Sequence, residues 1–248
     1  MAESGPGLIR LWNDFCGPEI PVANAVAYGT TAGGCNYYLG DYKVTGKLGE
    51  TDAGVVGLSI ASGAARLTCT NEDGEGCAVG TEVVFSPSLN GTLVAETRVQ
   101  MTGLATRNVF FGFCDVNIDQ VDEPLTATTT TLTLTASDIC GFTYDSQLSS
   151  SNWHMPYNGG STTGATDSTS VVSDVLPVLS EWDVLRVEIS NAGTARWYIN
   201  GALKQTVTNA VSTTVLQAAY VSVFGTTTTA VDLDVDYLLV EAYRDWTR

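Results

Sequence analysis

Apolar and polar side chains alternate with a period of two residues along much of the second half of the chain. Between 182 and 190, Leu185, Val187 and Ile189 would point to one side of an extended strand and Arg186 and Glu188 to the other. Successive side chains of a β-strand point to opposite faces, so this period indicates strands with one buried face. We therefore expect antiparallel sheets and not helices.

The composition also favours sheets. The 248 residues include 33 threonines but only 11 lysines and arginines. A branched Cβ packs well on a pleated sheet and crowds a helix. A folded chain of this length buries roughly 72% of its unfolded surface, which is enough for one large core. We expect an N-terminal arm over 1–12 and a single domain over 13–248, with a long loop near 157–169.

About ten segments have strand-like patterns, and turn residues separate them. These segments are 83–86, 93–101, 108–114, 126–136, 140–144, 182–190, 194–200, 202–207, 218–224 and 231–242. Asn200 and Gly201 predict a type I′ hairpin turn, because both tolerate positive φ. Segment 108–114 is apolar on both faces, so it must be covered by the second sheet and by a loop or a partner. The fold class predicted is an all-β, two-sheet antiparallel β-sandwich with almost no helix.

The formal net charge is −16, from 27 acidic and 11 basic residues. Nucleic acid and anionic lipid would repel a chain this acidic, so we expect neither as a partner. No run of 18 apolar residues occurs that could form a transmembrane helix. Residues 1–12 lack the basic and apolar segments of a secretory signal, so we expect synthesis in a cytoplasm.

The six cysteines lack metal-binding spacing, and His154 is the single histidine. We therefore expect no zinc site and no cofactor. Cys69 and Cys77 flank an acidic loop and could be bridged if their strands pair, but synthesis in a reducing compartment favours two thiols. The acidic stretches 71–76 and 115–119 offer oxygen ligands for calcium. The second departs from the EF-hand motif, and the first is more simply a solvated turn.

Six short segments spread over most of the chain carry aromatic, acidic and small residues at fold-defining positions. They are LWNDF at 11–15, LVAETRV at 93–99, RNVFFGFCD at 107–115, LRVEI at 185–189, WYING at 197–201 and VDY at 235–237. Their order resembles the concanavalin A-like (lectin/glucanase) jelly rolls of tailed-phage virion proteins, and the second and third are similar to that family's E-x-R-V … V-F-x-G-F-x-D hairpin. The resemblance implies a jelly-roll fold in a virion structural protein, most like a capsid decoration (cement) protein.

Asp232, Asp234 and Asp236 alternate on one predicted strand and would share a face, with neighbouring Cα atoms about 6.6 Å apart. Related glucanases carry E-x-D-x-E or E-x-D-x-x-E on a concave sheet, so one interpretation is a glycosidase. This chain departs from that motif, because all three positions are aspartate. The alternative is a solvated face that arginines on neighbouring strands neutralise. These arginines are Arg98, Arg186 and Arg196. We favour the alternative and expect no catalytic residue.

Trp153, His154 and Tyr157 precede a stretch rich in glycine, serine and threonine. Exposed aromatic rings can stack on a sugar, so these residues are candidates for a glycan or intersubunit contact. Over glycan binding we favour the alternative of an aromatic anchor that holds the long loop against the sandwich, or of an intersubunit contact.

From these features and the resemblance we expect a non-enzymatic virion protein on the capsid exterior, made in the host cytoplasm. It would bind and stabilise the lattice of the major capsid protein as a homotrimer. The partner-binding candidates lie in the arm and comprise Leu8, Ile9, Arg10, Leu11 and Trp12. Such an arm would be disordered alone and would order on a partner. The alternatives are a carbohydrate-binding head-fibre or tail module and, third, a glycoside hydrolase.

Overall fold

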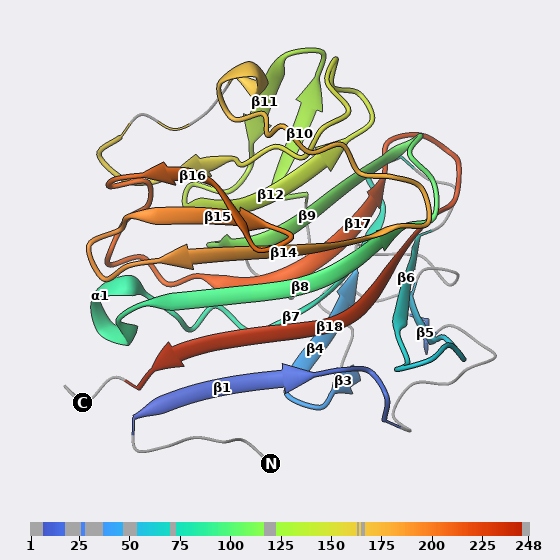
Figure 1. Cartoon of the computed structure of the whole chain (residues 1–248), viewed down its shortest axis with the longest axis horizontal. Coiled ribbons are helices and arrows are strands. Elements are labelled where there is room, and N and C mark those ends of the chain that lie inside the picture. The colour runs from blue at the N-terminus through green and yellow to red at the C-terminus, as the bar shows by residue number, and fades with distance from the viewer. Residues whose placement is uncertain are drawn as a thin grey trace.

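The computed structural model describes residues 7–17, 26–27, 37–46, 54–69, 73–116, 123–162, 164 and 167–244. Two antiparallel sheets lie face to face and form a sandwich (Figure 1). Helical structure in these ranges is limited to α1 (Pro87–Asn90) and the 3-10 turn η2 (Ser168–Ser170). The predicted all-β sandwich is confirmed. No helix in the same ranges is long and apolar enough to cross a membrane.

The larger sheet has nine strands, and the long strand β18 lies in its interior. In spatial order its strands are β16 (Ala202–Val207), β15 (Ala195–Ile199), β14 (Trp182–Ile189), β8 (Leu93–Met101), β18 (Val231–Tyr243), β6 (Ala65–Cys69), β5 (Gly54–Gly57) and β2 (Val26–Ala27). The ninth strand, β1 (Leu8–Asn13), also pairs with β18. Because β18 has 13 residues, β6 pairs with 231–235 and β1 pairs with 238–243.

The second sheet has seven strands. In spatial order they are β13 (Tyr157–Asn158), β12 (Ile139–Asp145), β9 (Arg107–Cys114), β17 (Ala218–Gly225), β7 (Gly76–Gly80), β4 (Tyr42–Gly46) and β3 (Tyr37–Leu39). Every residue of β9, β12 and β17 is buried. These strands are therefore covered on both faces.

Two hydrophobic cores account for this burial. Val109, Phe111 and Phe113 of β9 belong to the main core between the sheets. Phe110 and Cys114 belong to a second core on the opposite face of β9. The hairpin of β10 (Leu125–Thr128) and β11 (Thr131–Leu134) contributes apolar side chains to the second core, and it stands above β12 in Figure 1. The sequence predicted that a loop or a partner covers this face of the strand, and the β10–β11 hairpin of the same chain does so.

Strand positions in the second half agree with the sequence pattern, but three features differ. Segment 126–136 is the β10–β11 hairpin and not one strand, and segment 83–86 contributes only a single bridge from Phe85 to Gln217. Several short strands before residue 81 were not predicted, because their alternating runs span only two to six residues. The predicted hairpin turn is confirmed, since Asn200 and Gly201 have φ of 52° and 79°.

The N-terminal segment corrects the prediction of a free arm. Residues 8–13 form β1 and pair in register with 238–243 of β18. Ile9 and Leu11 are half-buried against the main core, and the Tyr42 hydroxyl donates a hydrogen bond of 2.9 Å to the Leu11 carbonyl. Backbone pairing and apolar burial therefore hold this segment in the sheet without a partner.

Candidate functional site

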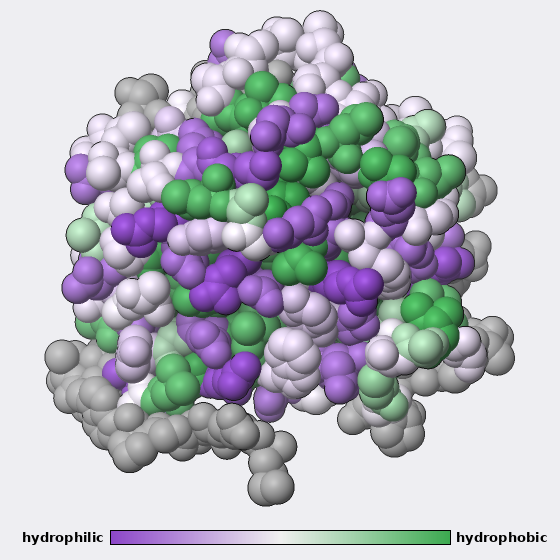
Figure 2. All heavy atoms as spheres, viewed as in Figure 1, coloured by the Kyte–Doolittle hydropathy of each residue, from purple (hydrophilic) through white to green (hydrophobic). Residues whose placement is uncertain are grey.

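The side of the nine-stranded sheet that faces away from the main core carries a continuous polar and aromatic surface, which we call the outer face. Its central side chains come from β15, β14, β8, β18 and β1. They are Arg196, Tyr198, Trp182, Arg186, Glu188, Glu96, Arg98, Tyr237, Arg10 and Trp12. Figure 2 views this side, where hydrophilic and hydrophobic residues are interspersed.

Five of these side chains form a hydrogen-bonded row across four neighbouring strands, which we call the polar row. The Tyr237 hydroxyl donates to Glu96 Oε1 at 2.8 Å. Arg186 donates from Nη1 to Glu96 Oε2 at 3.0 Å and from Nε to Glu188 Oε1 at 2.9 Å. The Tyr198 hydroxyl donates to Glu188 Oε2 at 3.3 Å. The strand register places Arg186 directly opposite both Glu96 and Tyr198, so the sheet itself positions the row.

Aromatic rings flank the polar row. Trp12 stacks on Tyr237 with ring centroids 4.8 Å apart and planes inclined by 22°. Trp12 remains 47% exposed, so part of its indole is open to solvent. The guanidinium of Arg98 on β8 lies 4.7 Å from the centre of the Trp182 ring on β14 and donates to Asp236 at 2.7 Å. Each of these rings is thus held in a fixed orientation.

Within the row, the pKa values of Tyr237 and Arg186 are both raised. Burial, and then the hydrogen bond to Glu96, raise the pKa of Tyr237 well above its usual value. Burial lowers the pKa of Arg186, but its hydrogen bonds to Glu188 and Glu96 outweigh this and raise the pKa. The phenol protons are donated to Glu96 and Glu188, so the outer face presents fixed phenol and carboxylate oxygens around the Arg186 guanidinium.

The aspartates of β18 correct the prediction of a solvated row. Asp234 is only 3% exposed and accepts two hydrogen bonds from Arg66, at 2.6 and 2.9 Å. Asp236 pairs with Arg98 as expected, whereas Arg186 pairs with glutamates. A register shift between Val235 and Tyr237 disrupts the simple alternation that the sequence suggested. The three carboxylates therefore do not form one exposed row.

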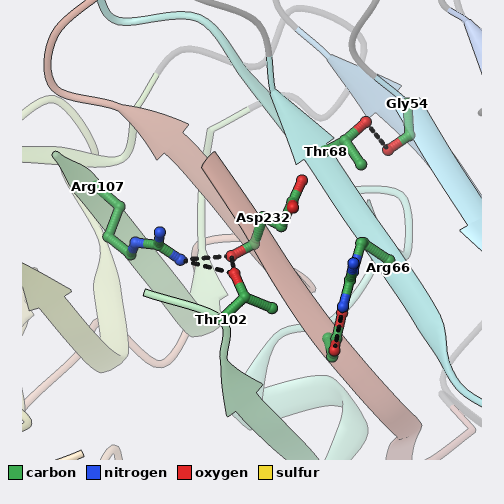
Figure 3. A network of polar contacts seen from close by, with 7 residues as sticks. Gly54, Arg66, Thr68, Thr102, Arg107 and Asp232 are labelled. Carbon is green, nitrogen blue, oxygen red and sulfur yellow. Dashed lines mark hydrogen bonds and ion pairs between the residues drawn. The ribbon is translucent and has the colours of Figure 1, made fainter. Parts of the chain in front are cut away.

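Asp232 has a structural role at the start of β18. Its backbone carbonyl accepts hydrogen bonds from Arg107 Nη1 at 2.6 Å and from the Thr102 hydroxyl at 2.9 Å. Figure 3 shows these contacts beside Arg66 of β6, whose guanidinium is hydrogen-bonded to Asp234 of β18. Burial raises the pKa of the Asp232 carboxyl, and the nearby Arg66 charge lowers it by less. The network joins the end of β8 and the start of β9 to β18.

The expected aromatic contact site lies inside the molecule. Trp153 and His154 are both 0% exposed, so neither offers a surface to a glycan or a second subunit. The Trp153 indole donates to Asp183 at 2.9 Å and meets Tyr144 edge-on at 6.2 Å. Tyr157 is half-buried against Trp197. This arrangement corrects the contact-site expectation, because Trp153 and His154 lie in the interior and pair through their backbones with residues 172–175.

Two adjoining hollows of about 510 and 320 Å³ lie at one end of the sandwich, and Gln147 and Thr226 line both. The smaller also contains Asp73, Glu123 and Asp145. Burial raises the pKa of Asp145 to about 6, although its hydrogen bond from the Gln147 amide lowers it. Within the described ranges, no three His, Cys, Asp or Glu side chains are grouped in a way that could hold a metal ion.

The remaining sequence candidates are structural or lie outside the described residues. Cys69 and Cys77 are thiols, as favoured, and they donate to the backbone carbonyls of Glu75 and Gly54, at 2.6 and 3.3 Å. Parts of both acidic calcium candidates, residues 71–72 and 117–119, lie outside the described ranges.

The fold is shared with several solved structures. A protein of unknown function from Shewanella oneidensis MR-1 aligns over 100% of this chain and 92% of its own, with 12% identity and a TM-score of 0.61. The Emp47p carbohydrate recognition domain aligns over 90% and 99%, with 9% identity and a TM-score of 0.54. A Bacillus licheniformis β-glucanase aligns over 98% and 99%, with 10% identity and a TM-score of 0.54. The sandwich is thus a concanavalin A-like jelly roll of the lectin/glucanase kind.

No protein-family model matches the sequence, and no curated protein matches it. At these identities the structural likeness defines the fold alone.

Sequence reasoning missed most of the outer face. Glu96, Glu188, Tyr198 and Tyr237 were not singled out, and Arg186 was considered only as a partner for aspartates. The available signal was the outward position of polar residues on each alternating strand. That signal shows which residues share a face of their own strand, but it does not show which strands are neighbours.

Proposed function

We propose that this chain is a non-catalytic carbohydrate-binding protein that holds a neutral polysaccharide on its outer face. The polar row is the observation that carries the proposal. Sugars are recognised by aromatic rings that cover their apolar faces and by fixed polar groups that meet their hydroxyls. The outer face supplies both, with Trp12 stacked directly on the Tyr237 end of the row.

The dimensions of the row suit a linear ligand. From Tyr198 on β15 to Trp12 on β1 the face crosses four inter-strand steps, which is about 19 Å. The row lies on the strands themselves, so its spacing is set by sheet hydrogen bonding. A ligand therefore meets groups that are already in position and loses little affinity to ordering them.

Charge favours a neutral glycan over an acidic one. The carboxylates of Glu96 and Glu188 share the single guanidinium of Arg186, and Asp236 is paired with Arg98. The surface therefore has no uncompensated positive cluster at its centre, while the whole chain carries −16. An anionic polysaccharide would be repelled by that field.

The same pairing supports binding without hydrolysis. A glycosidase needs one carboxylic acid that is protonated and a second carboxylate on the other side of the bond. On the polar row, Glu96 and Glu188 each accept from an arginine and a tyrosine. Both carboxyls are therefore held by neighbouring side chains as fixed acceptors, an arrangement that supports binding.

Calorimetry with neutral and uronic-acid oligosaccharides tests the proposal. We expect binding of a neutral oligosaccharide, about fivefold weaker in Trp12→Ala, because one stacking contact contributes about 1 kcal/mol. Tyr38→Ala is the matched control, since Tyr38 is 55% exposed on the other sheet. The absence of binding to any neutral glycan, or release of reducing ends during incubation, would contradict the proposal.

A second candidate is the virion role, in which the outer face binds the major capsid protein and decorates the capsid exterior. The observation that favours it is composition, because tryptophan, tyrosine and arginine are the residues enriched at binding hot spots. Arg10 and Trp12 of the predicted docking segment do point outward on this face. Co-sedimentation of wild type and Trp12→Ala with capsids distinguishes the two roles, since only the virion role requires the protein to bind capsids.

A further inference from the structure

The single histidine of the chain is buried, and its ring is poorly provided with hydrogen bonds. His154 is fully buried, and neither of its ring nitrogens has a hydrogen-bond partner of normal geometry. A buried polar group without a partner costs free energy, and such groups are few in folded proteins. Burial lowers the pKa of His154, and the nearby backbone carbonyl of Asn152 raises it by less. The position is therefore suited to a neutral imidazole.

The ring lies on the face of the seven-stranded sheet that is turned away from the main core, which we call the covered face. Trp153 and Met155 both pack in the main core, so the side chain between them points to the opposite face. The backbone of His154 is bridged to Thr143 of β12, and Thr143 is in register with Phe110 of the second core. The β10–β11 hairpin, which stands above β12 in Figure 1, covers this core.

The hairpin over the covered face is a separate element. Strands β10 and β11 pair with each other and with neither large sheet. Isolated bridges join Thr129 to Leu148 and Thr131 to Asp167. An element outside the sheet ladders, held mainly by side-chain burial, opens at a lower free energy than the core strands. The hairpin can therefore open while both large sheets remain paired.

Other titratable groups lie around the covered face, and the buried carboxyl among them opposes opening in acid. On β9, β12, β17, the hairpin and the segments beside them, these groups are Asp73, Cys114, Glu123, Asp145, Tyr157, Asp167, Asp174 and Tyr220. Burial raises the pKa of Asp145 to about 6, so its protonation stabilises the closed form. Hydrogen bonds lower the pKa values of Asp167 and Asp174, so both stay ionised above about pH 5.

We propose that His154 is an acid-sensitive switch that opens the β10–β11 hairpin when its ring is protonated. At neutral pH the uncharged ring occupies its buried position beneath the hairpin. Protonation places an unpaired charge there, and opening of the hairpin lets water solvate that charge. Opening also uncovers apolar side chains of the second core, among them Phe110, Leu125 and Leu132. The switch acts on the sheet opposite the outer face and does not depend on glycan binding.

Hydrogen exchange of the full chain at about pH 7.5 and 5.5 tests the switch in wild type and His154→Leu. A ring that stays neutral when buried and has its usual pKa of about 6.5 when exposed makes opening about tenfold more favourable over this range. Asp145 acts in the opposite direction in both proteins, so the ratio of wild-type to variant protection isolates the histidine. We expect this ratio to fall about tenfold for the β10 and β11 amides, which should be less protected than those of β8 and β18 at both pH values.

Ser222→Ala is the matched control, because Ser222 is a second buried side chain on the covered face without a hydrogen-bond partner, and it does not titrate. This variant should keep the pH dependence of wild type. Nuclear magnetic resonance of wild type needs no variant, since His154 is the only histidine and its ring signals are assigned directly. A native ring that titrates at about pH 6.5 or above would overturn the proposal. So would a protection ratio that stays constant with pH, or hairpin amides as protected as those of β8 and β18.

Discussion

At the residue scale, charged side chains that look equivalent in the alternating sequence differ in how deeply they are buried. Asp234 resembles its neighbours in the sequence, yet it is almost fully buried and has two hydrogen bonds to Arg66. A buried pair of this kind is costly to break, because the partner is left without its counter-charge. Asp236 pairs somewhat more openly, since 15% of its side chain is exposed compared with 4% for Asp234.

We expect Asp234→Asn to lower the free energy of unfolding by about 2 kcal/mol, because hydrogen bonds to charged groups contribute about that much. Urea denaturation measures the change. Asp236→Asn is the control and should cost less than about 1 kcal/mol, since more exposed pairs contribute little. Equal losses of unfolding free energy in the two variants would show that burial does not distinguish the two ion pairs.

A second prediction at this scale concerns Asp145, whose pKa is raised from 3.8 to about 6. A carboxyl with a raised folded-state pKa stabilises the fold below pH 3.8, and this contribution is lost as pH rises through 6. Asp145→Asn removes the titrating carboxyl and with it this pH dependence of the unfolding free energy. Relative to wild type, the variant should therefore gain up to about 3 kcal/mol between pH 4 and pH 7. Urea melts at both pH values check this, and a difference that stays constant with pH would contradict it.

At the element scale, strand β1 shows how one segment can serve two surfaces. Ile9 and Leu11 pack towards the main core, while Arg10 and Trp12 reach Glu241 and Tyr237 on the outer face. A strand divided in this way is part of the fold as well as part of the binding surface. Its deletion removes a sheet strand, so point variants separate the two roles more sharply.

We expect Ile9→Ser/Leu11→Ser to destabilise the protein by about 2 kcal/mol, because two half-buried apolar side chains are lost from the core. Arg10→Ser/Trp12→Ser on the same strand should change stability by less than about 1 kcal/mol. Thermal melts of the two double variants provide the comparison. A neutral result for the inward pair would mean that β1 is not docked in solution.

The β10–β11 hairpin supports a prediction of its own. Leu132 is 1% exposed in the second core, so Leu132→Ala should cost about 3 kcal/mol through lost burial and a cavity. Leu134 is only partly buried against the same core, and Leu134→Ala should cost clearly less. Chemical denaturation of both variants decides this, and a cost below about 1 kcal/mol for Leu132→Ala would show that the hairpin does not cover the sheet.

At the scale of the whole molecule, one main core runs between the two sheets and joins strands from both ends of the chain. We therefore expect a single cooperative unfolding transition, seen at the same denaturant concentration by tryptophan fluorescence and by far-ultraviolet circular dichroism. The circular dichroism spectrum should be that of a β-protein. A helix content above about a fifth, or two separate transitions, would contradict this architecture.

The local sequence pattern was sufficient to predict the fold class and to predict which side chains of each strand face the core. The two-sided apolar run of β9 correctly required a cover, because a strand with apolar residues on both faces cannot leave either in water. Strand neighbours were decided only by the tertiary structure: β1 pairs with the far end of the chain, and Arg186 meets Glu96 across 90 residues. Hydrogen bonds between distant strands depend on register, which alternation within one strand does not encode. The polar row therefore became visible only when four strands were aligned side by side.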